Sequence, residues 1–215
     1  MKNVVKGIRL LTVIHFLLMV VLVGSVSASA QEEPISRIEK AVEEIIRILE
    51  DKKQAAPALG EEKRSQIMDI VEKHFDFREM SKRTLARHWK ARTADEQEQF
   101  VKKFAKLLKE TYIKKIENYS GEKVIFHKQD IEGNKAIVYS GFNRNNVETP
   151  VNYKLLISSD QWMIYDVIIE GVSLVRNWRT QFDSIMSKEK FSGLMARLDE
   201  KINPAGSDEP TDQDK

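Results

Sequence analysis

One short segment, residues 162–182, constrains the fold more than any other part of the chain. Its first half alternates residue by residue, and both alternating sets are largely apolar, as in a strand that is buried on both faces. Gly171 ends this pattern. Beyond it, apolar side chains recur at three- and four-residue steps, at Val175, Trp178 and Phe182. The sequence therefore predicts an aromatic-rich strand joined directly to an aromatic-rich helix through a turn at the glycine.

The first thirty residues have the layout of a cleavable secretory signal. Basic residues come first, an apolar run covers residues 10–23, and small residues end at Ala30, after which we expect cleavage. The alternative is a membrane anchor, but this run is shorter than the ~20 apolar residues that a spanning helix needs. We therefore predict a signal at residues 1–30, a folded domain at residues 31–202 and a disordered tail at residues 203–215.

Charge and composition limit the partners and the chemistry of the exported domain. The chain has 35 Lys and Arg against 33 Asp and Glu, and the predicted signal holds three of the basic residues and no acid, which leaves 32 against 33. We expect no nucleic-acid partner, because proteins that follow phosphates need a strong positive excess. The sequence has no cysteine, which excludes disulfides and thiol catalysis. No metal site is expected from the spacing of His74, His88 and His127.

Periodicity divides the domain into helices, then strands, then helices. Thr93 and Glu96 form the pattern of a capping box at the start of the longest helix. Helical spacing predicts six helices, at about residues 34–49, 67–75, 77–89, 94–119, 172–186 and 189–201. Period-two alternation and short turns predict an antiparallel meander of four strands, at residues 123–128, 135–142, 148–158 and 162–170. The predicted class is α+β, with helices gathered on one face of a curved sheet.

The predicted strands carry more apolar side chains than a sheet covered on one face needs. These side chains are expected to form one broad wall: Tyr139, Val151, Tyr153, Leu155, Tyr165, Val167 and Ile169. A stripe on the long helix, Phe104, Leu108 and Tyr112, is expected to face that wall. Spacing alone leaves two interpretations open, a cavity or an ordinary filled core, because apolar stripes usually pack and periodicity does not reveal empty space.

Four motifs follow one another along the mature chain. They are FDFREMS at residues 75–81 with Leu85 and Trp89 after it, EQFVKKFAKLLKETY at residues 98–112, VNY at residues 151–153 and DVIIEGVSL at residues 166–174. In this order they resemble the motifs of the MlaC family of periplasmic phospholipid carriers, also called toluene-tolerance proteins. The departures are small: Ala86 stands where a glycine is common, Asn152 replaces an acid and Trp178 replaces a tyrosine.

The resemblance implies an NTF2-like or cystatin-like sheet wrapped by helices around a hydrophobic pocket for a diacyl phospholipid. It implies no cofactor and no catalysis, but a monomer that exchanges lipid with an outer-membrane lipoprotein complex and an inner-membrane ABC transporter. Arg144 and Arg179 are expected near the lipid phosphate, with a solvated surface arginine as the alternative for each. The residues expected to contact the lipid are Phe104, Leu108, Tyr112, Tyr139, Tyr153, Tyr165, Val167, Ile169, Val172 and Leu174.

Two other functions stay open on the residues alone. An enzyme of cone-shaped fold would use Asp166 as a general base, although an aspartate near the end of a strand is more often structural. A protein-binding adaptor without a ligand results if the aromatic surplus is ordinary core. Ser173 lacks the glycine pattern of a nucleophile elbow and is predicted to hydrogen-bond in the first helical turn. The basic residues at 82–92 are either a solvated helix face or a patch for anionic partners.

Overall fold

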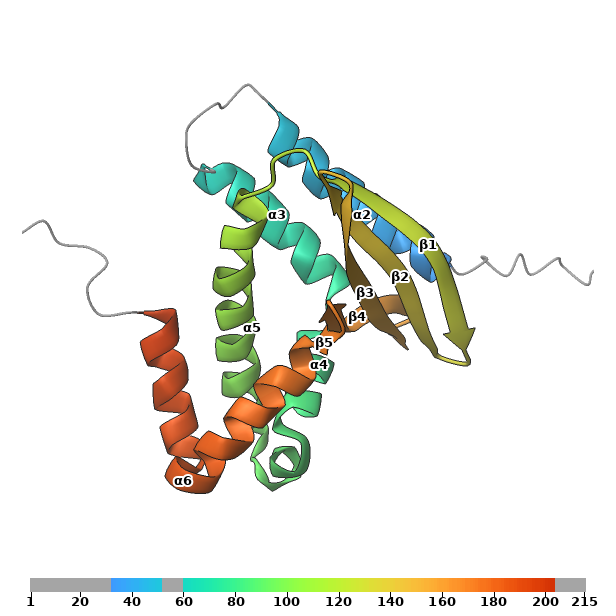
Figure 1. Cartoon of the computed structure of the whole chain (residues 1–215). Coiled ribbons are helices and arrows are strands. Elements are labelled where there is room, and N and C mark those ends of the chain that lie inside the picture. Colours follow the sequence, from blue (N-terminus) through green and yellow to red (C-terminus); the bar gives the residue numbers. More distant parts are fainter. Residues whose placement is uncertain (1–31, 52–59, 204–215) are drawn as a thin grey trace, which may run out of the picture. The chain divides into compact units, whose positions relative to one another are not determined.

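The computed structural model describes residues 32–51 and 60–203, which form an α+β domain (Figure 1). The helices are α2 (Pro34–Glu50), α3 (Glu61–His74), α4 (Phe77–Leu85), the 3-10 helix η2 (Ala86–Ala91), α5 (Ala94–Glu117) and α6 (Leu174–Ile202). The strands are β1 (Lys123–Glu132), β2 (Lys135–Arg144), β3 (Val147–Ser158), β4 (Gln161–Ile169) and β5 (Val172–Ser173). The predicted fold class and the predicted order of helices, sheet and helices are therefore confirmed.

Two of the predicted segments fall outside the part of the chain that is described. They are the secretory signal at residues 1–30 and residues 204–215 of the disordered tail. Within residues 32–51 and 60–203, no helix is both long enough and apolar enough to cross a membrane.

The strands form one antiparallel sheet in the order β1-β2-β3-β4-β5. Each long strand pairs with its neighbour in sequence, which confirms the meander, and the two-residue β5 is added to the predicted four. The turns at residues 145–146 and 159–160 each hold two consecutive residues with positive φ, between 49° and 63°. Such two-residue turns match the natural twist of paired strands and bring consecutive strands side by side.

A β-bulge interrupts the pairing of β3 with β4. Asp166 pairs with Lys154 and Ile164 pairs with Leu155, so Tyr165 is an extra residue on β4. An extra residue bends its strand and increases the local twist, and the sheet in Figure 1 is curved. The bulge also interrupts the alternation of side chains, so that positions three residues apart face the same side across it.

Capping residues fix the starts of α4 and α5. The predicted capping box is present at α5: the Glu96 amide donates to Thr93 Oγ1 at 3.1 Å, and the Thr93 amide donates to Glu96 Oε2 at 2.9 Å. At α4, Asp76 Oδ1 accepts from the Glu79 amide at 2.8 Å. These local hydrogen bonds satisfy amides that have no partner inside the helix.

The C-terminal helix begins later than the sequence predicts. Glu170 (φ 50°) and Gly171 (φ 80°) form the turn, and Val172 then returns to the sheet in β5. Ser173 is the N-cap of α6, and its Oγ accepts from the amide three residues later at 3.0 Å. The backbone is not helical at Lys190 (φ 59°, ψ −167°), which divides α6 into the orange and red limbs of Figure 1. This break accounts for the two helices predicted there.

Two separate apolar clusters stabilise the domain. The first joins α4, η2, α5 and α6, and its aromatic members include Phe100, Phe104, Trp178 and Phe182. Their ring centroids lie between 5.4 and 6.0 Å apart. Burial of each such ring contributes about 1.5–3 kcal/mol. The second cluster lies between α2 and the sheet and includes Ile38, Val138 and Leu155. Because α5 and α6 are held by their own core, they do not have to fill the concave face of the sheet.

Candidate functional site

A cavity of about 620 Å³ lies between the sheet and helices α2, α3 and α5. Each of these elements turns an apolar face toward it. The lining includes Ile38, Val42, Ile45 and Leu49 of α2, Met68, Ile70 and Val71 of α3, Leu108, Tyr112 and Ile116 of α5, and Val151, Tyr153, Ile164, Val167 and Ile169 of the sheet. A volume of this size falls within the range of ligand sites in proteins, roughly 300–1,000 Å³.

The apolar side chains of α2 show that this region is not a filled core. Ile38 is only 2% exposed, whereas Val42, Ile45 and Leu49 line the same cavity and are half-buried. Apolar groups that face open space lose the dispersion contacts that close packing provides. An apolar ligand restores those contacts when it fills the space. The cavity interpretation therefore describes this face of the sheet better than ordinary core does.

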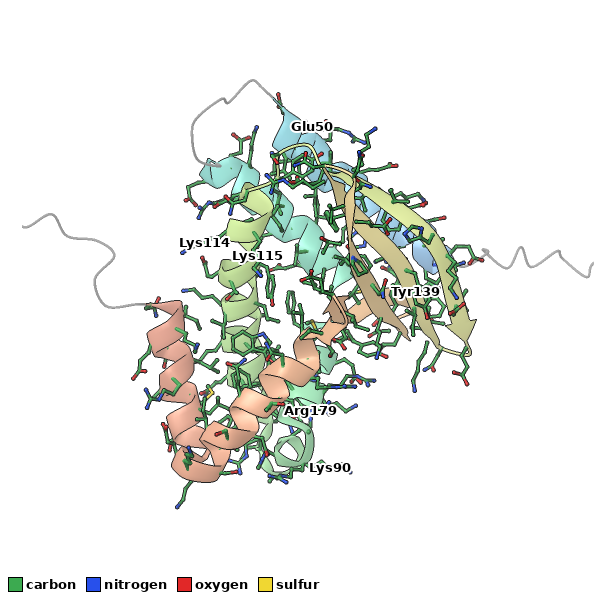
Figure 2. All side chains as sticks on the ribbon, viewed as in Figure 1. Glu50, Lys90, Lys114, Lys115, Tyr139 and Arg179 are labelled. Carbon is green, nitrogen blue, oxygen red and sulfur yellow. The ribbon has the colours of Figure 1, made fainter. Side chains whose placement is uncertain are left out.

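Polar and charged side chains gather at one end of the lining. They are Lys115, Asn118, Tyr119, Glu122, Arg144 and Thr149. Arg144 Nε lies 3.3 Å from Glu122 Oε1, and Arg144 Nη2 donates to Ser120 Oγ at 3.0 Å. The Tyr119 hydroxyl donates to Glu50 Oε1 at 3.3 Å, which brings the end of α2 next to the end of α5 (Figure 2).

The carboxylate of Glu122 is ionised and holds Arg144 in place. The Ser120 amide donates to Glu122 Oε2 at 2.8 Å, and this hydrogen bond is the main reason that the pKa of Glu122 is lowered. The Arg144 side chain stays 65% exposed while its Nε faces this carboxylate. A fixed and accessible guanidinium at the end of an apolar cavity is suited to bind an anionic oxygen.

Three titratable groups deeper in the cavity are neutral near pH 7. Burial raises the pKa of Tyr153 to about 12 and also raises the pKa of Tyr112. Burial, followed by the nearby charge of Arg37, lowers the pKa of His74. No group of His, Asp and Glu in the described part of the chain is arranged to hold a metal ion. The lining thus combines a largely apolar interior, in which Lys109 is paired with Glu72, with one polar end.

Comparison with known proteins agrees with this geometry. Residues 39–200 match the sequence profile of the family described as MlaC protein. The chain belongs to the MlaC family. The "Intermembrane phospholipid transport system binding protein MlaC" of Haemophilus influenzae is 19% identical to it over 202 residues, which cover 91% of this chain and 94% of that protein. The resemblance inferred from the four motifs is thereby confirmed.

A solved structure shares the fold. It is the phospholipid-binding protein from Ralstonia solanacearum in complex with a phospholipid, with a TM-score of 0.72 and 24% sequence identity. The similarity covers 80% of this chain and 97% of that chain. At this level of identity the comparison establishes the α+β architecture of the MlaC domain.

Of the ten lipid contacts predicted from the MlaC resemblance, six line the cavity. They are Leu108, Tyr112, Tyr153, Val167, Ile169 and Leu174. The first two lie one helical turn apart on α5, and the next three lie on the concave face of the sheet. Contact between these side chains and a lipid stays a prediction.

Four of the ten lie outside this lining, each for a different reason. Phe104 is fully buried in the helical cluster, because the aromatic side chains of α6 cover it. Tyr139 is on the opposite face of the sheet, beneath Lys128 Nζ at 4.6 Å from its ring. Tyr165 is the bulge residue and packs against the helical cluster. Val172 is 58% exposed in β5.

The two predicted headgroup cations lie in different places. Arg144 lines the polar end of the cavity, whereas Arg179 Nε donates to the backbone oxygen of Arg83 at 2.8 Å and so links α6 to α4. Figure 2 labels Arg179 on the orange limb of α6. The basic segment at residues 82–92 is largely paired with acids, namely Glu79, Glu96 and Asp183.

Asp166 links the sheet to α6. Its Oδ2 accepts from Ser173 Oγ at 2.7 Å and its Oδ1 accepts from the Val175 amide at 3.0 Å, and the residue is 5% exposed. Asp166 does not belong to the cavity lining. This geometry gives the carboxylate a structural task and leaves it without access to a ligand in the cavity.

Sequence reasoning missed the contribution of α2 and α3. The stripe of α2 was predicted as an amphipathic helix, but its spacing does not tell what covers it. One signal was available: Ile45 and Ile46 are adjacent and are followed by Leu49, which widens the apolar face beyond a single stripe. Ile45, Ile46 and Leu49 all line the cavity.

Proposed function

We propose that this protein is a periplasmic phospholipid carrier that shields the acyl chains of a diacyl phospholipid in its cavity. One observation carries the proposal: an apolar cavity of about 620 Å³ with most of its charged residues at one end. This distribution matches a ligand with a long hydrocarbon part and one polar group. The name of the Haemophilus influenzae relative and the phospholipid held by the Ralstonia solanacearum protein support the same function.

The binding energy would come from burial of methylene groups. Each methylene removed from water contributes about 0.8 kcal/mol, so the ~30 methylenes of two chains amount to about 24 kcal/mol. This exceeds the roughly 18–21 kcal/mol at which non-covalent binding saturates. Ordering of the chains and incomplete burial must therefore offset part of the gain. A carrier benefits from that offset, because a lipid held too tightly would not be released.

The headgroup would lie at the polar end, with Arg144 next to the lipid phosphate. Glu122 and Ser120 hold the guanidinium at this end through contacts of 3.3 and 3.0 Å. Lys115 is a second cation of the lining, and its Nζ lies 5.3 Å from the centre of the Tyr112 ring. Because Glu122 offsets one of the two positive charges, the pull on an anionic headgroup would be moderate.

The wider proposal follows the role of an Mla-like system. The chain would be exported through the signal at residues 1–30 and act as a monomer without a cofactor. It would exchange lipid with an outer-membrane lipoprotein complex and an inner-membrane ABC transporter. The sequence holds no nucleotide-binding motif, so any net direction of transport must come from a partner. We also propose that the protein is not an enzyme, in line with the structural task of Asp166.

Extraction of the purified mature protein with organic solvent tests the proposal. One diacyl phospholipid per chain, identified by mass spectrometry, is the expected result. A folded protein that carries no lipid after purification, and takes none from vesicles, would favour the adaptor. Chemical turnover of the extracted lipid that is lost in Asp166→Asn would favour the enzyme. Binding of lipid by Asp166→Asn without any turnover agrees with the carrier.

A further inference from the structure

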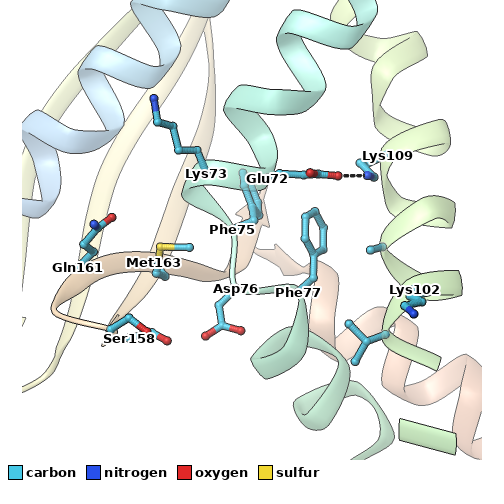
Figure 3. Close-up of a pocket in the computed structure, with 13 residues that line it drawn as sticks. Glu72, Lys73, Phe75, Asp76, Phe77, Lys102, Lys109, Ser158, Gln161 and Met163 are labelled. Atoms are coloured by element: carbon cyan, nitrogen blue, oxygen red, sulfur yellow. Dashed lines mark hydrogen bonds and ion pairs between the residues drawn. The ribbon is translucent and has the colours of Figure 1, made fainter. Parts of the chain in front are cut away.

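A second concave surface, here called the side groove, lies between α3, α5 and the β3–β4 hairpin (Figure 3). It has a volume of about 670 Å³. Its floor is apolar and its rim carries charged and polar groups. The floor includes Phe75, Phe77, Val101 and Met163, and the rim includes Lys102 and Gln161.

The side groove and the cavity share a wall. Phe75, Phe77 and Lys109 line both spaces, so the partition between them is one residue thick. The two phenyl rings are stacked with centroids 6.0 Å apart and an interplanar angle of 20°. Figure 3 shows both rings between the β4 side of the groove and α5. Two apolar spaces are thus separated by two aromatic side chains.

The backbone of this wall is fixed, while its side chains are less constrained. Phe75 forms a β-bridge with Ile164, and the Asp76 amide donates to the Ile164 oxygen at 2.8 Å. Asp76 also caps α4. Both rings, in contrast, are only half-buried. Rotation of the rings would therefore open a passage without any change in the sheet or in α4.

An ion pair between Glu72 of α3 and Lys109 of α5 lies above the two rings (Figure 3). The Glu72 side chain is 57% exposed, and such surface pairs contribute little to stability. This contact between α3 and α5 therefore adds little resistance to separation of the two rings.

The floor of the groove, rather than its rim, determines which ligand fits. Lys109 is paired with Glu72 and Lys102 lies 3.6 Å from Glu98, so these cations are already engaged with acids. Lys73 is a third cation of the lining and Asp76 adds a further carboxylate, so the positive and negative charges around the groove nearly balance. A compensated rim gives no strong preference for a phosphate, whereas the phenyl rings, Val101 and Met163 provide a surface for hydrocarbon.

We propose that the side groove is a second acyl-chain site, which one chain of the bound phospholipid enters from the cavity when the Phe75 and Phe77 rings separate. The proposal rests on the carrier function proposed above. The groove is open to solvent, so a chain in it is only partly shielded. This makes it a site occupied during transfer, while the cavity holds the chains between transfers.

A photoreactive lipid tests the site directly. The protein is loaded with a phosphatidylglycerol whose second chain ends in a diazirine, irradiated and mapped by mass spectrometry. Adducts are expected at cavity residues such as Leu108 and also at Val101 and Met163, which line the groove alone. Ile131 is the control, because it is apolar, 48% exposed and lines neither space.

The possible outcomes separate this proposal from the carrier function. Adducts in the cavity alone, or adducts at Ile131 as frequent as those in the groove, would overturn the second site and leave the carrier intact. Adducts in neither space would overturn both. Adducts in the groove that exceed those at Ile131 about tenfold, as expected for a chain held on an apolar surface, would support the site.

Cross-linking tests the passage. The chain has no cysteine, so Glu72→Cys/Lys109→Cys can be joined selectively by a short bismaleimide across the rings. We expect the cross-link to reduce groove adducts and lipid transfer between vesicles about tenfold relative to the same double variant with its thiols free. Lys103→Cys/Asp199→Cys, which replaces an ion pair between α5 and α6, is the matched control. Equal effects in the two linked proteins, or no effect in the first, would refute the passage.

Discussion

Two valines, five residues apart in sequence, allow the cavity to be tested with one type of substitution. Val167 lines the cavity and is 7% exposed, whereas Val172 lies outside the lining and is 58% exposed. Sequence reasoning assigned both to lipid contact. We now expect Val167→Trp to reduce lipid binding and Val172→Trp to leave it unchanged, because only the first ring projects into the space that the chains need.

The size of the effect follows from the volume that the larger ring takes. Tryptophan adds roughly seven heavy atoms to valine, which displace about as many methylenes at about 0.8 kcal/mol each, or about 5 kcal/mol in total. The lipid can shift toward the polar end and recover part of this loss. We therefore expect the binding free energy to weaken by about 3 kcal/mol, which raises Kd roughly a hundredfold. The cavity can hold the ring, so unfolding should change by no more than the ~1–3 kcal/mol of ordinary overpacking.

The assay is quantitative lipid extraction, with competition from phosphatidylglycerol vesicles for the affinity and urea unfolding as the control for the fold. The reasoning is refuted if Val167→Trp is folded and binds lipid as the parent protein does. It is equally refuted if Val172→Trp loses as much lipid as Val167→Trp, since a general loss of stability would then explain both.

Three further predictions follow from the polar contacts. Arg144→Gln should weaken binding of anionic phospholipid by up to about 1 kcal/mol, or about fivefold, while Arg179→Gln leaves it unchanged, as measured by vesicle competition. Burial of Tyr153, with its pKa of about 12, should contribute stability that is fully present below the unfolded pKa of about 10 and lost as pH rises to 12. Over this pH range, the free energy of unfolding measured with urea should fall by about 2–3 kcal/mol less in Tyr153→Phe than in the parent protein. An equal fall in the two proteins would contradict the burial of Tyr153. Asp166→Asn should lower the unfolding free energy by about 1–3 kcal/mol, because it weakens the bonds from Ser173 and Val175, with lipid content retained.

The fold was predictable because its signals are local. Alternation along residues 135–142 and 148–158, short turns and the Thr93 capping box each depend on a few neighbouring residues. These signals gave the order of elements and the class. The start of α6 was two residues wrong, because Val172 has the spacing of a helix but pairs with β4. The pairing of β5 with β4 across the turn at Gly171 therefore decides where the helix begins.

The site was only partly predictable because its boundaries are set by distant contacts. Phe104 and Leu108 have the same helical spacing, but Phe104 is covered by α6 and Leu108 faces the cavity. Tyr139 and Tyr153 each lie in a segment of strand-like alternation, and the register of the hairpin puts them on opposite faces of the sheet. Tyr165 lies outside the cavity lining because of the bulge, which leaves no mark in the hydrophobic pattern. The part of the cavity lining that α2 provides could not be predicted, because such a prediction requires knowledge of the elements that face this helix.

The bulge in β4 also makes this strand unusually tolerant of a change in length at one point. Length changes are ordinarily confined to surface loops, because an indel inside a strand inverts every side chain beyond it. Deletion of Tyr165 would instead leave an unbroken ladder, with Ile164 and Val167 still facing the cavity and Asp166 still facing away from it. Deletion of Ile168, in contrast, would turn Ile169 away from the cavity. A one-residue gap at position 165 in an alignment of sequences is therefore compatible with the same cavity-facing surface of β4, at the cost of the contact between Tyr165 and Arg83.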